Sequence, residues 1–229
     1  MKIFKTVISL LKVKKLSLIE KHNVSGNIFT FIFDSKTDLN WVPGQHGIFR
    51  ITHKKIKKAT RLFSIASLPE ENKIIISTRI HEEPSAFKKA MSELKPGMTI
   101  DMRGPIGSLY KKNDRMKIMI ATGIGITPYR GIVKEVTKSE NSKFRLLYLS
   151  KESDFIYKDI LSCENNDLVE CYNQRKDMLN SLDNLIENYK NNADYYIVGS
   201  PKVVKSIEQL IKEKGISRKN IRKDTFFGY

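Results

Sequence analysis

An apolar run that leads into a glycine-containing turn, residues 117–131, constrains the fold of this chain more than any other stretch. Residues 117–121 have the length and composition of a buried strand. Thr127-Pro128 then predicts the start of a helix, where proline is favoured near the first position. Gly123 and Gly125 can adopt dihedrals closed to other residues and allow close approach to a ligand. Because the free N–H groups of a helix start favour a pyrophosphate, the stretch predicts either an anion site or a tight turn without ligand.

The half of the chain that contains this turn alternates between strand and helix patterns. The predicted strands are 118–121, 144–149, 168–172 and 195–198. The predicted helices, 176–189 and 201–214, carry apolar residues at helical spacing. This order of strands and helices is typical of a parallel sheet, so we expect an α/β domain here.

The preceding half shows β patterns. Residues 27–33 alternate apolar side chains between two faces, and further strands are predicted at 47–52, 74–80 and 99–102. One helix is predicted after Ser85, a credible N-cap. Short strands separated by turns favour a small antiparallel β-barrel. A polar break at 111–114 divides the chain into two predicted domains, 1–110 and 111–229.

Composition narrows the classes of protein that fit. The chain has 229 residues, of which 40% are hydrophobic, so it can bury a core. No apolar run approaches the length of a membrane span and no cleavage site follows the N-terminus, so we expect a cytoplasmic protein. Cys163 and Cys171 have no metal-type spacing and are expected to be reduced thiols, which excludes an iron–sulfur centre. Four histidines, at 22, 46, 53 and 81, form no ligand pattern, and we expect no metal.

The formal net charge of +16 favours an acidic partner, phosphorylated ligands or an anionic surface. The lysines are scattered without interleaved aromatics, so no nucleic acid is expected. Residues 1–15 place apolar side chains at helical spacing beside lysines. This pattern suits a membrane-surface helix, although we favour an N-terminal helix or strand packed on the body.

Short motifs follow one another along the chain in a characteristic order. They are Pro43-Gly44-Gln45, Arg61-Leu62-Phe63-Ser64, Ser85-Ala86-Phe87, Gly104-Pro105-Ile106-Gly107, Gly123-Ile124-Gly125-Ile126-Thr127-Pro128 and Asp224-Thr225-Phe226-Phe227-Gly228-Tyr229. In this order and spacing, from about Leu16 to Tyr229, they resemble the ferredoxin–NADP reductase superfamily of flavin-dependent oxidoreductases. Each motif alone has low specificity, whereas the ordered set is highly specific. The resemblance implies a flavin-binding barrel followed by a Rossmann-like nucleotide-binding domain.

The resemblance also implies roles in flavin binding. Arg61 would bind the flavin phosphates, and Leu62 lies within the same motif. Phe63 would lie against the isoalloxazine ring, and Ser64 would hydrogen-bond near its N5 atom. The helix capped by Ser85 would hold the pyrophosphate of FAD. FMN remains an alternative because residues 82–84 lack the glycine that many relatives have.

On the nucleotide side, the implied binding residues are Gly123, Gly125, Thr127, Pro128 and Gly199. The strand that ends at Ser150-Lys151 has no acid at its tip, so NADPH is expected rather than NADH, with Lys151 near the 2′-phosphate. Tyr229 would stack on the flavin. Ser64 and Asp224 would form a partial catalytic group, because Val198 stands where many relatives have cysteine.

The function expected from the resemblance is transfer of hydride from NADPH to N5 of FAD, followed by transfer of single electrons to a separate acceptor. A basic protein suits an acidic ferredoxin or flavodoxin. The alternatives are a flavin, ferric or cytochrome reductase, or a non-autonomous electron-transfer subunit of a complex.

Overall fold

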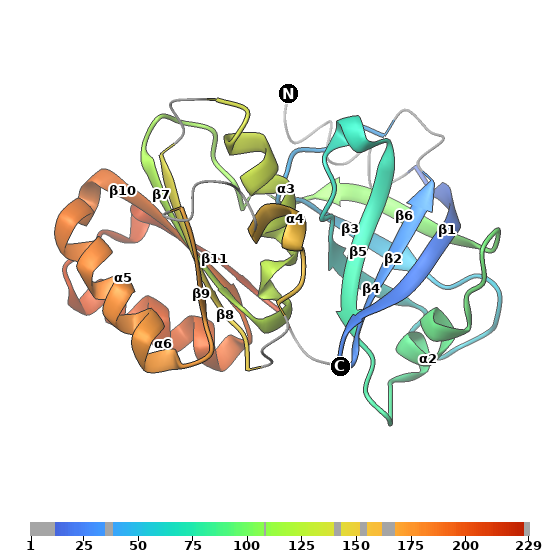
Figure 1. The fold of residues 1–229 in the computed structure, drawn as a ribbon. Coiled ribbons are helices and arrows are strands. Elements are labelled where there is room, and N and C mark those ends of the chain that lie inside the picture. Colours follow the sequence, from blue (N-terminus) through green and yellow to red (C-terminus); the bar gives the residue numbers. More distant parts are fainter. Residues whose placement is uncertain are drawn as a thin grey trace. The chain divides into compact units, whose positions relative to one another are not determined.

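The structure, a computed structural model, describes residues 12–34, 39–107, 109–139, 143–151, 155–161 and 168–226. It contains two compact units, one extending to Tyr110 and the other beginning at Lys111. Figure 1 labels the helices and strands of both. Most of the predicted N-terminal segment 1–15, and the last three residues of the C-terminal motif, lie outside the described residues.

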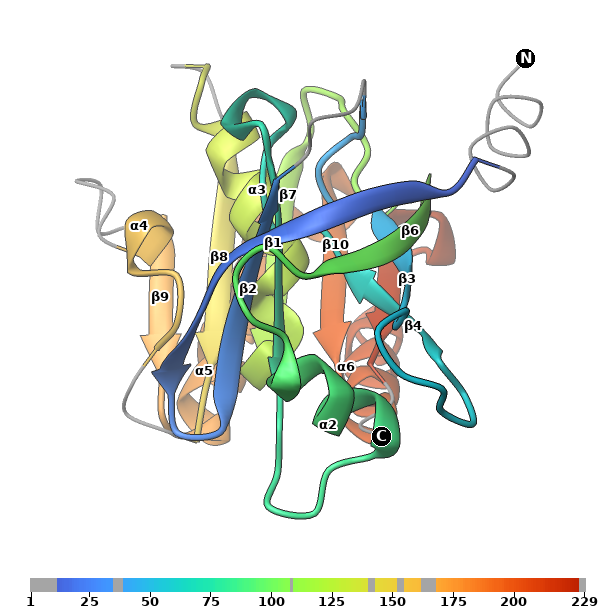
Figure 2. The same ribbon diagram turned by 90° about the vertical axis from the view of Figure 1, so that its right-hand side faces the viewer.

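The first unit is an antiparallel β structure. Its six strands are hydrogen-bonded in the order β4-β3-β6-β1-β2-β5. The elements are β1 (Lys14–Ser25), β2 (Ile28–Asp34), β3 (His46–Arg50), β4 (Thr60–Ser64), β5 (Lys73–Arg79), α2 (Ala86–Glu93) and β6 (Thr99–Ile106). Strand β1 is long enough to pair with β6 through its first residues and with β2 along the rest of its length, as Figure 2 shows.

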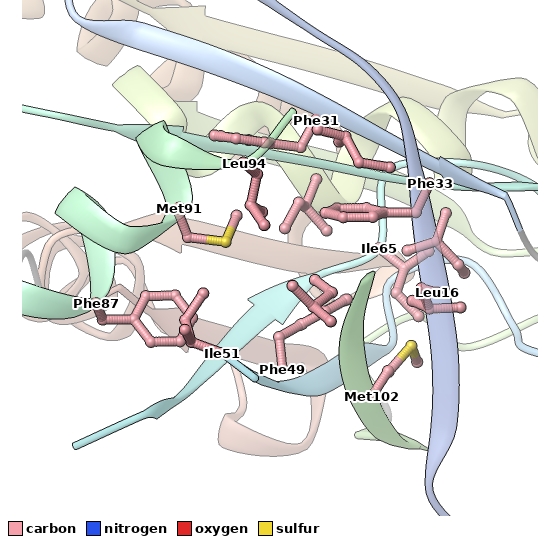
Figure 3. Packing of buried hydrophobic residues seen from close by; sticks show 14 of the residues in the cluster. Leu16, Phe31, Phe33, Phe49, Ile51, Ile65, Phe87, Met91, Leu94 and Met102 are labelled. Atoms are coloured by element: carbon pink, nitrogen blue, oxygen red, sulfur yellow. The ribbon is translucent and has the colours of Figure 1, made fainter. Parts of the chain in front are cut away.

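The core of this unit follows from the alternation in β2. Phe31 lies opposite Ile76 of β5, and Phe33 lies opposite Ile74, so these apolar side chains share one face of the sheet. Phe87 and Met91 of α2 complete the same cluster (Figure 3). Helix α2 therefore closes the barrel-like core.

The second unit is a parallel sheet with strand order β11-β10-β7-β8-β9. Its elements are β7 (Met116–Thr122), η2 (Gly123–Ile126), α3 (Thr127–Val136), β8 (Phe144–Leu149), α4 (Lys158–Leu161), β9 (Val169–Tyr172), α5 (Arg175–Tyr189), β10 (Ala193–Gly199), α6 (Pro201–Glu213) and β11 (Ile221–Thr225). Helices α5 and α6 cover one face of this sheet, and α3 lies on the other (Figure 1).

The predicted fold class, an antiparallel β domain followed by a parallel α/β domain, is confirmed. The sequence did not reveal β1, β4, β11 or α4. In β1 the buried apolar side chains Leu16 and Leu18 are followed mostly by polar residues, and β4 and β11 are each only five residues long. Strand β6 runs to Ile106, four residues beyond the predicted end, because its continuation pairs with β3.

The described ranges contain neither a membrane-spanning helix nor a cluster of metal-ligating residues. No helix there is long and apolar enough to cross a bilayer. The same ranges hold no cluster of three or more histidine, cysteine, aspartate or glutamate residues suited to a metal ion.

Candidate functional site

Strand β4 positions the central residues of the Arg61–Ser64 motif on two faces. Arg61 and Phe63 lie opposite Phe49 and Gly47 of β3, facing the core, whereas Leu62 projects outward and is 54% exposed. The guanidinium carbon of Arg61 lies 5.5 Å from the ring centroid of Phe87, in cation–π geometry. Arg61 Nη1 also donates to the carbonyl oxygens of Lys58, at 3.2 Å, and Thr60, at 2.8 Å. These contacts hold Arg61 over the first turn of α2.

Two further cations belong to this region, because Lys88 feels the charges of both Arg61 and Arg79. Ser85 caps α2 by accepting a long hydrogen bond from the backbone N–H of Lys88, at 3.5 Å. Partial burial lowers the pKa of Lys88, and the positive charges of Arg61 and Arg79 lower it further. The chain therefore gathers three cations at a helix N-terminus, an arrangement that favours a phosphate group.

Arg79 is held in place by its own polar contacts. Its Nη1 donates to Asn27 Oδ1 at 3.0 Å, and the amide nitrogen of Asn27 lies 2.9 Å from His81 Nδ1. Because arginine only donates, the amide oxygen of Asn27 faces Arg79 and its NH₂ group faces the imidazole. Asn27 thus fixes Arg79 at the end of β5.

Phe63 packs among other aromatic rings. Its centroid lies 5.8 Å from that of Phe49 at an interplanar angle of 66°, and 5.8 Å from that of Phe87 at 34°. The ring is only partly buried, so a surface remains for a further planar group. Packing of Phe63 in the core and stacking on a flavin are therefore compatible.

Ser64 provides a direct test of whether a flavin fits. The residue is 3% exposed, and its Oγ has no hydrogen-bond partner in the part of the chain that the structure describes. A buried hydroxyl without a partner costs about 1–3 kcal/mol. A ring nitrogen of a bound cofactor would supply the missing partner, so the residues present fit a flavin.

The glycine turn of the second unit differs in detail from the prediction. Helical structure begins at Gly123, as the short 3-10 helix η2, and continues directly into α3. Gly123 has φ of +53°, in the region that favours glycine. Thr127 and Pro128 are buried, and Thr127 Oγ1 donates to the Ile124 carbonyl oxygen at 2.8 Å. The accessible helix start is thus Gly123 and Ile124, and not Thr127.

Gly125 serves packing within the domain. A Cβ at this position would lie 2.4 Å from the Val198 carbonyl oxygen and 3.1 Å from the Gly199 nitrogen. A Cβ at Gly199 would in turn lie 2.1 Å from Thr122 Oγ1. The two glycines therefore let the turn after β7 rest against the end of β10. From β7 the chain continues to its neighbour β8 on one side, whereas β10 lies beside β7 on the other side. The carboxyl end of β7 is therefore the topological switch point of the sheet, the place where open α/β sheets bind ligands.

Three further predicted residues, Ser150, Lys151 and Asp224, lie at the carboxyl ends of strands in this unit. Ser150 is buried and donates its backbone N–H to the Tyr172 carbonyl oxygen at 3.0 Å, whereas Lys151 is exposed. Asp224 lies opposite Val198 in the β10–β11 register. Burial raises the pKa of the Tyr129 phenol, and the negative charge of Asp224 raises it further. Tyr229 is outside the described residues.

Comparison with known protein families identifies the type of domain that the first unit resembles. The sequence model of the oxidoreductase FAD-binding domain matches residues 15–110, which include Arg61, Ser64, Arg79 and Lys88. This match covers the first unit and supports the resemblance of the chain to the ferredoxin–NADP reductase superfamily. The first unit thus carries the sequence signature of an oxidoreductase FAD-binding domain.

Similar proteins share less than a third of their aligned residues with this chain and are longer than it is. Component C of methane monooxygenase from Methylosinus trichosporium is 29% identical over 150 residues, covering 60% of this chain and 43% of that protein. One subunit of the Na(+)-translocating NADH-quinone reductase from Haemophilus influenzae (strain PittGG) is 28% identical over 217 residues, covering 80% of this chain and 52% of that protein. The chain thus spans about half the length of the curated relatives it matches.

Solved structures share the whole fold. Ferredoxin-NADP+ reductase from Plasmodium falciparum, as its H286L mutant, aligns with a TM-score of 0.79 at 15% identity, over 95% of this chain and 97% of that chain. The ferredoxin reductase in carbazole 1,9a-dioxygenase aligns with a TM-score of 0.79 at 16% identity, over 94% of this chain and 70% of that chain. At these identities the alignments show the fold.

Sequence reasoning missed Arg79 and Lys88 as members of the site. Lys88 is three residues after the Ser85 cap, a position inside the first helical turn, which was a usable signal. Arg79 offered no local signal, because its place depends on the register that sets it opposite Ile28 in β2.

Proposed function

We propose that the chain is a flavin-dependent NAD(P)H oxidoreductase that accepts hydride from NADPH into FAD and passes single electrons to a separate acceptor. The observation that carries this proposal is the convergence of Arg61, Arg79 and Lys88 at the Ser85-capped start of α2. Three cations in a partly buried position favour a bound anion, and the diphosphate of FAD is such an anion.

The residues of the barrel would divide the work of binding between the two ends of the cofactor. Arg61, Arg79 and Lys88 would hold the diphosphate, and Phe63 would support the ring system. The Ser64 hydroxyl would bond to the flavin near N5. The flavin, when bound, supplies the conversion between two-electron and one-electron transfer. FMN, which lacks the diphosphate, would leave part of this charge unmatched.

In the second unit, the open helix start at Gly123 and Ile124 suits the coenzyme pyrophosphate. The exposed Lys151, at the tip of β8, is our candidate for contact with the 2′-phosphate of NADPH. Asp224, together with Ser64, is proposed near the reacting atoms. Stacking of Tyr229 on the flavin remains a prediction from the family resemblance, and a Tyr229→Ser variant with unchanged flavin spectrum and coenzyme affinity would contradict it.

The proposed acceptor is an acidic carrier of the ferredoxin or flavodoxin kind. The net charge of +16 favours electrostatic steering toward such a protein. We expect the reaction to take place in the cytoplasm, where both cysteines would stay reduced.

A visible spectrum of the purified protein, followed by anaerobic titration with NADPH and then NADH, tests the proposal. We expect flavin absorbance bands that bleach on addition of NADPH and, less efficiently, of NADH. Extraction and chromatography of the cofactor would distinguish FAD from FMN. A protein that neither retains nor binds added flavin would refute the proposed function.

The second candidate is a reductase subunit that works only within a larger complex. The chain matches about half of a monooxygenase component and half of one quinone reductase subunit, which favours this alternative. Dye reduction by the isolated chain separates the two. Turnover with NADPH and an artificial acceptor supports an autonomous reductase, whereas flavin binding without turnover supports a role only within a complex.

A further inference from the structure

The loop between β3 and β4, residues 51–59, contains a lysine in a backbone conformation that lysine rarely adopts. Lys58 has φ of +109°, the largest positive value of any non-glycine residue in the described ranges. An L side chain in this region crowds the adjacent peptide groups, so the conformation costs free energy that glycine would avoid. A lysine at a position where glycine would be less strained indicates that the lysine side chain has a role.

Contacts at both ends of the loop hold this conformation in place. The Ile51 N–H donates to the Ala59 carbonyl oxygen at 2.9 Å and closes the loop immediately before β4. Lys54 Nζ donates to Glu93 Oε1 of α2 at 2.9 Å and to Oε2 at 2.6 Å. A strained residue persists where the surrounding structure fixes its backbone, and these contacts fix the backbone around Lys58.

The strained residue is hydrogen-bonded to the arginine of the Arg61–Ser64 motif. Arg61 Nη1 donates to the Lys58 carbonyl oxygen at 3.2 Å, while the same guanidinium lies over the Phe87 ring. The Lys58 backbone thus contacts the group that is proposed to bind the flavin phosphates. Lys58 is exposed, and a lysine has a flexible four-carbon stem. Its ammonium group can therefore reach an anion that the Arg61 guanidinium binds.

A lysine-rich surface alone does not account for Lys58. Lys55 and Lys57 of the same loop are also exposed, but neither has a positive φ. Glycine would therefore relieve no such strain at either position. Lys58 differs from these two lysines because it combines an unfavourable backbone conformation with a hydrogen bond to Arg61.

We propose that Lys58 is a further binding residue for the diphosphate of FAD, whose ammonium group binds the same anion as the Arg61 guanidinium. This inference rests on the proposed function, in which Arg61, Arg79 and Lys88 bind the diphosphate. Lys58 adds a flexible cation from the β3–β4 loop to cations that the strands and α2 present. An ammonium group on a flexible stem can follow phosphate oxygens that face the solvent. Because FMN has one phosphate fewer, Lys58 favours FAD over FMN.

The Lys58→Gly variant tests the proposal, because it removes the strain and the ammonium group together. We expect the FAD dissociation constant, measured by fluorescence quenching, to rise about threefold to tenfold. This range lies between the effect of an exposed ion pair and that of a charged hydrogen bond. The rise should shrink at high salt, which screens an exposed charge. An unchanged or lower dissociation constant in Lys58→Gly would overturn the proposal.

The stability of the flavin-free protein tests the strain separately. Lys57→Gly is the matched variant, since it removes a neighbouring lysine and adds the same chain entropy to the unfolded state without relieving strain. We expect a higher urea midpoint for Lys58→Gly than for Lys57→Gly, and an FAD dissociation constant near the wild-type value for Lys57→Gly. A midpoint for Lys58→Gly that is no higher than for Lys57→Gly would overturn the proposal, because Lys58 would then carry no strain.

Two further variants separate the charge of Lys58 from its backbone. Lys58→Arg retains a cation on a long side chain and should bind FAD about as well as wild type. Lys190→Gly relieves a positive φ of +41° at a lysine of the second unit and should leave FAD affinity unchanged. If Lys58→Arg loses as much FAD affinity as Lys58→Gly, the positive charge is not what binds the cofactor and the proposal is wrong.

The identity of the anion at Lys58 is tested with the same variant. The dissociation constant for FMN should rise less in Lys58→Gly than that for FAD. If Lys58→Gly binds FAD as wild type does but reduces an acidic ferredoxin more slowly, Lys58 belongs to a docking surface and the present inference is wrong. If wild type binds no FAD, the proposed function fails; if wild type and Lys58→Gly bind FAD equally well, only the present inference fails.

Discussion

Gly125 of the turn after β7 and Val198 of β10 are in contact through backbone atoms, because a Cβ on residue 125 would lie 2.4 Å from the Val198 carbonyl oxygen. The neighbouring pair, Gly199 and Thr122, is equally close, but there the clashing atom is a side-chain hydroxyl oxygen. A side chain can change rotamer, whereas strand β10 is hydrogen-bonded on both sides and cannot yield. The close contact at Gly125 thus fixes the shape of the nucleotide turn.

The Gly125→Ala variant should therefore be damaged more than Gly199→Ala. We expect about 1–3 kcal/mol less stability in urea unfolding for Gly125→Ala, the usual cost of overpacking, and a larger rise in the NADPH concentration needed for flavin reduction. FAD content should not change, because the barrel is untouched. If the two substitutions lower stability and NADPH affinity equally, the backbone contact at Gly125 is not the stricter constraint.

Arg61→Ala should yield protein that is largely free of flavin. The contact with Phe87 already holds the guanidinium in place, so little side-chain entropy is lost when it binds a phosphate. Its removal therefore takes away a pre-organised cation. We expect FAD binding to weaken by at least about tenfold, consistent with the loss of one charged hydrogen bond. Flavin occupancy after purification measures the effect. Arg103→Ala, which removes an exposed arginine from β6 of the same domain, is the matched control, and full occupancy in Arg61→Ala would remove Arg61 from the site.

Much of this architecture was readable from local patterns. The alternation of Phe31 and Phe33 predicted the buried face of β2, and the Ser85 cap predicted the start of α2. What escaped prediction depends on the pairing of distant strands. The contact of Arg79 with Asn27 follows from the β2–β5 register.

The opposition of His46 and Ser64 has the same origin. The four histidines form no ligand pattern in the sequence, so nothing there places His46 beside Ser64. Only the β3–β4 register sets it opposite Ser64. Register depends on the hydrophobic faces of whole strands, so a motif of four residues does not reveal it.

Lys151→Asp should lower the efficiency with NADPH more than that with NADH. Lys151 is exposed at the tip of β8, and an aspartate there would repel a 2′-phosphate while accepting a hydrogen bond from a ribose hydroxyl. We expect the ratio of kcat/KM for NADPH to that for NADH to fall about tenfold or more, the scale of one charged contact. Lys219→Asp is the control, since this exposed lysine precedes β11 and thus lies at the opposite edge of the sheet. Equal losses with both coenzymes would exclude Lys151 from the 2′-phosphate site.

Electron transfer to an acidic ferredoxin or flavodoxin should slow steeply as ionic strength rises. The Debye length falls from about 30 Å at 0.01 M salt to about 3 Å at 1 M, which removes long-range steering by the net positive charge. Reduction of a small neutral dye should hardly change over the same range and controls for effects on hydride transfer. A rate with the acidic carrier that is independent of salt would point to a different class of acceptor.

FAD affinity should fall at alkaline pH through Lys88. Burial and the charges of Arg61 and Arg79 hold the pKa of Lys88 below 10.5 in the flavin-free protein, so this lysine loses its proton earlier than an ordinary lysine as pH rises. A diphosphate binds the charged form better, and affinity therefore drops as pH passes through the lowered pKa. The stability of the flavin-free protein depends on pH with the opposite sign. Between the lowered value and 10.5 the unfolded chain holds the proton more tightly, so stability against urea rises with pH.

Lys88→Gln should remove both pH dependences, and it should bind FAD more weakly than wild type at neutral pH. Lys89→Gln, a change at the exposed neighbouring lysine, should retain both dependences. The measurements are FAD dissociation constants and urea midpoints from neutral pH upward, expressed as ratios to wild type so that titration of the flavin itself cancels. If Lys88→Gln keeps the wild-type pH profile of FAD affinity, Lys88 does not face the diphosphate, and the phosphate site would be confined to Arg61 and Arg79.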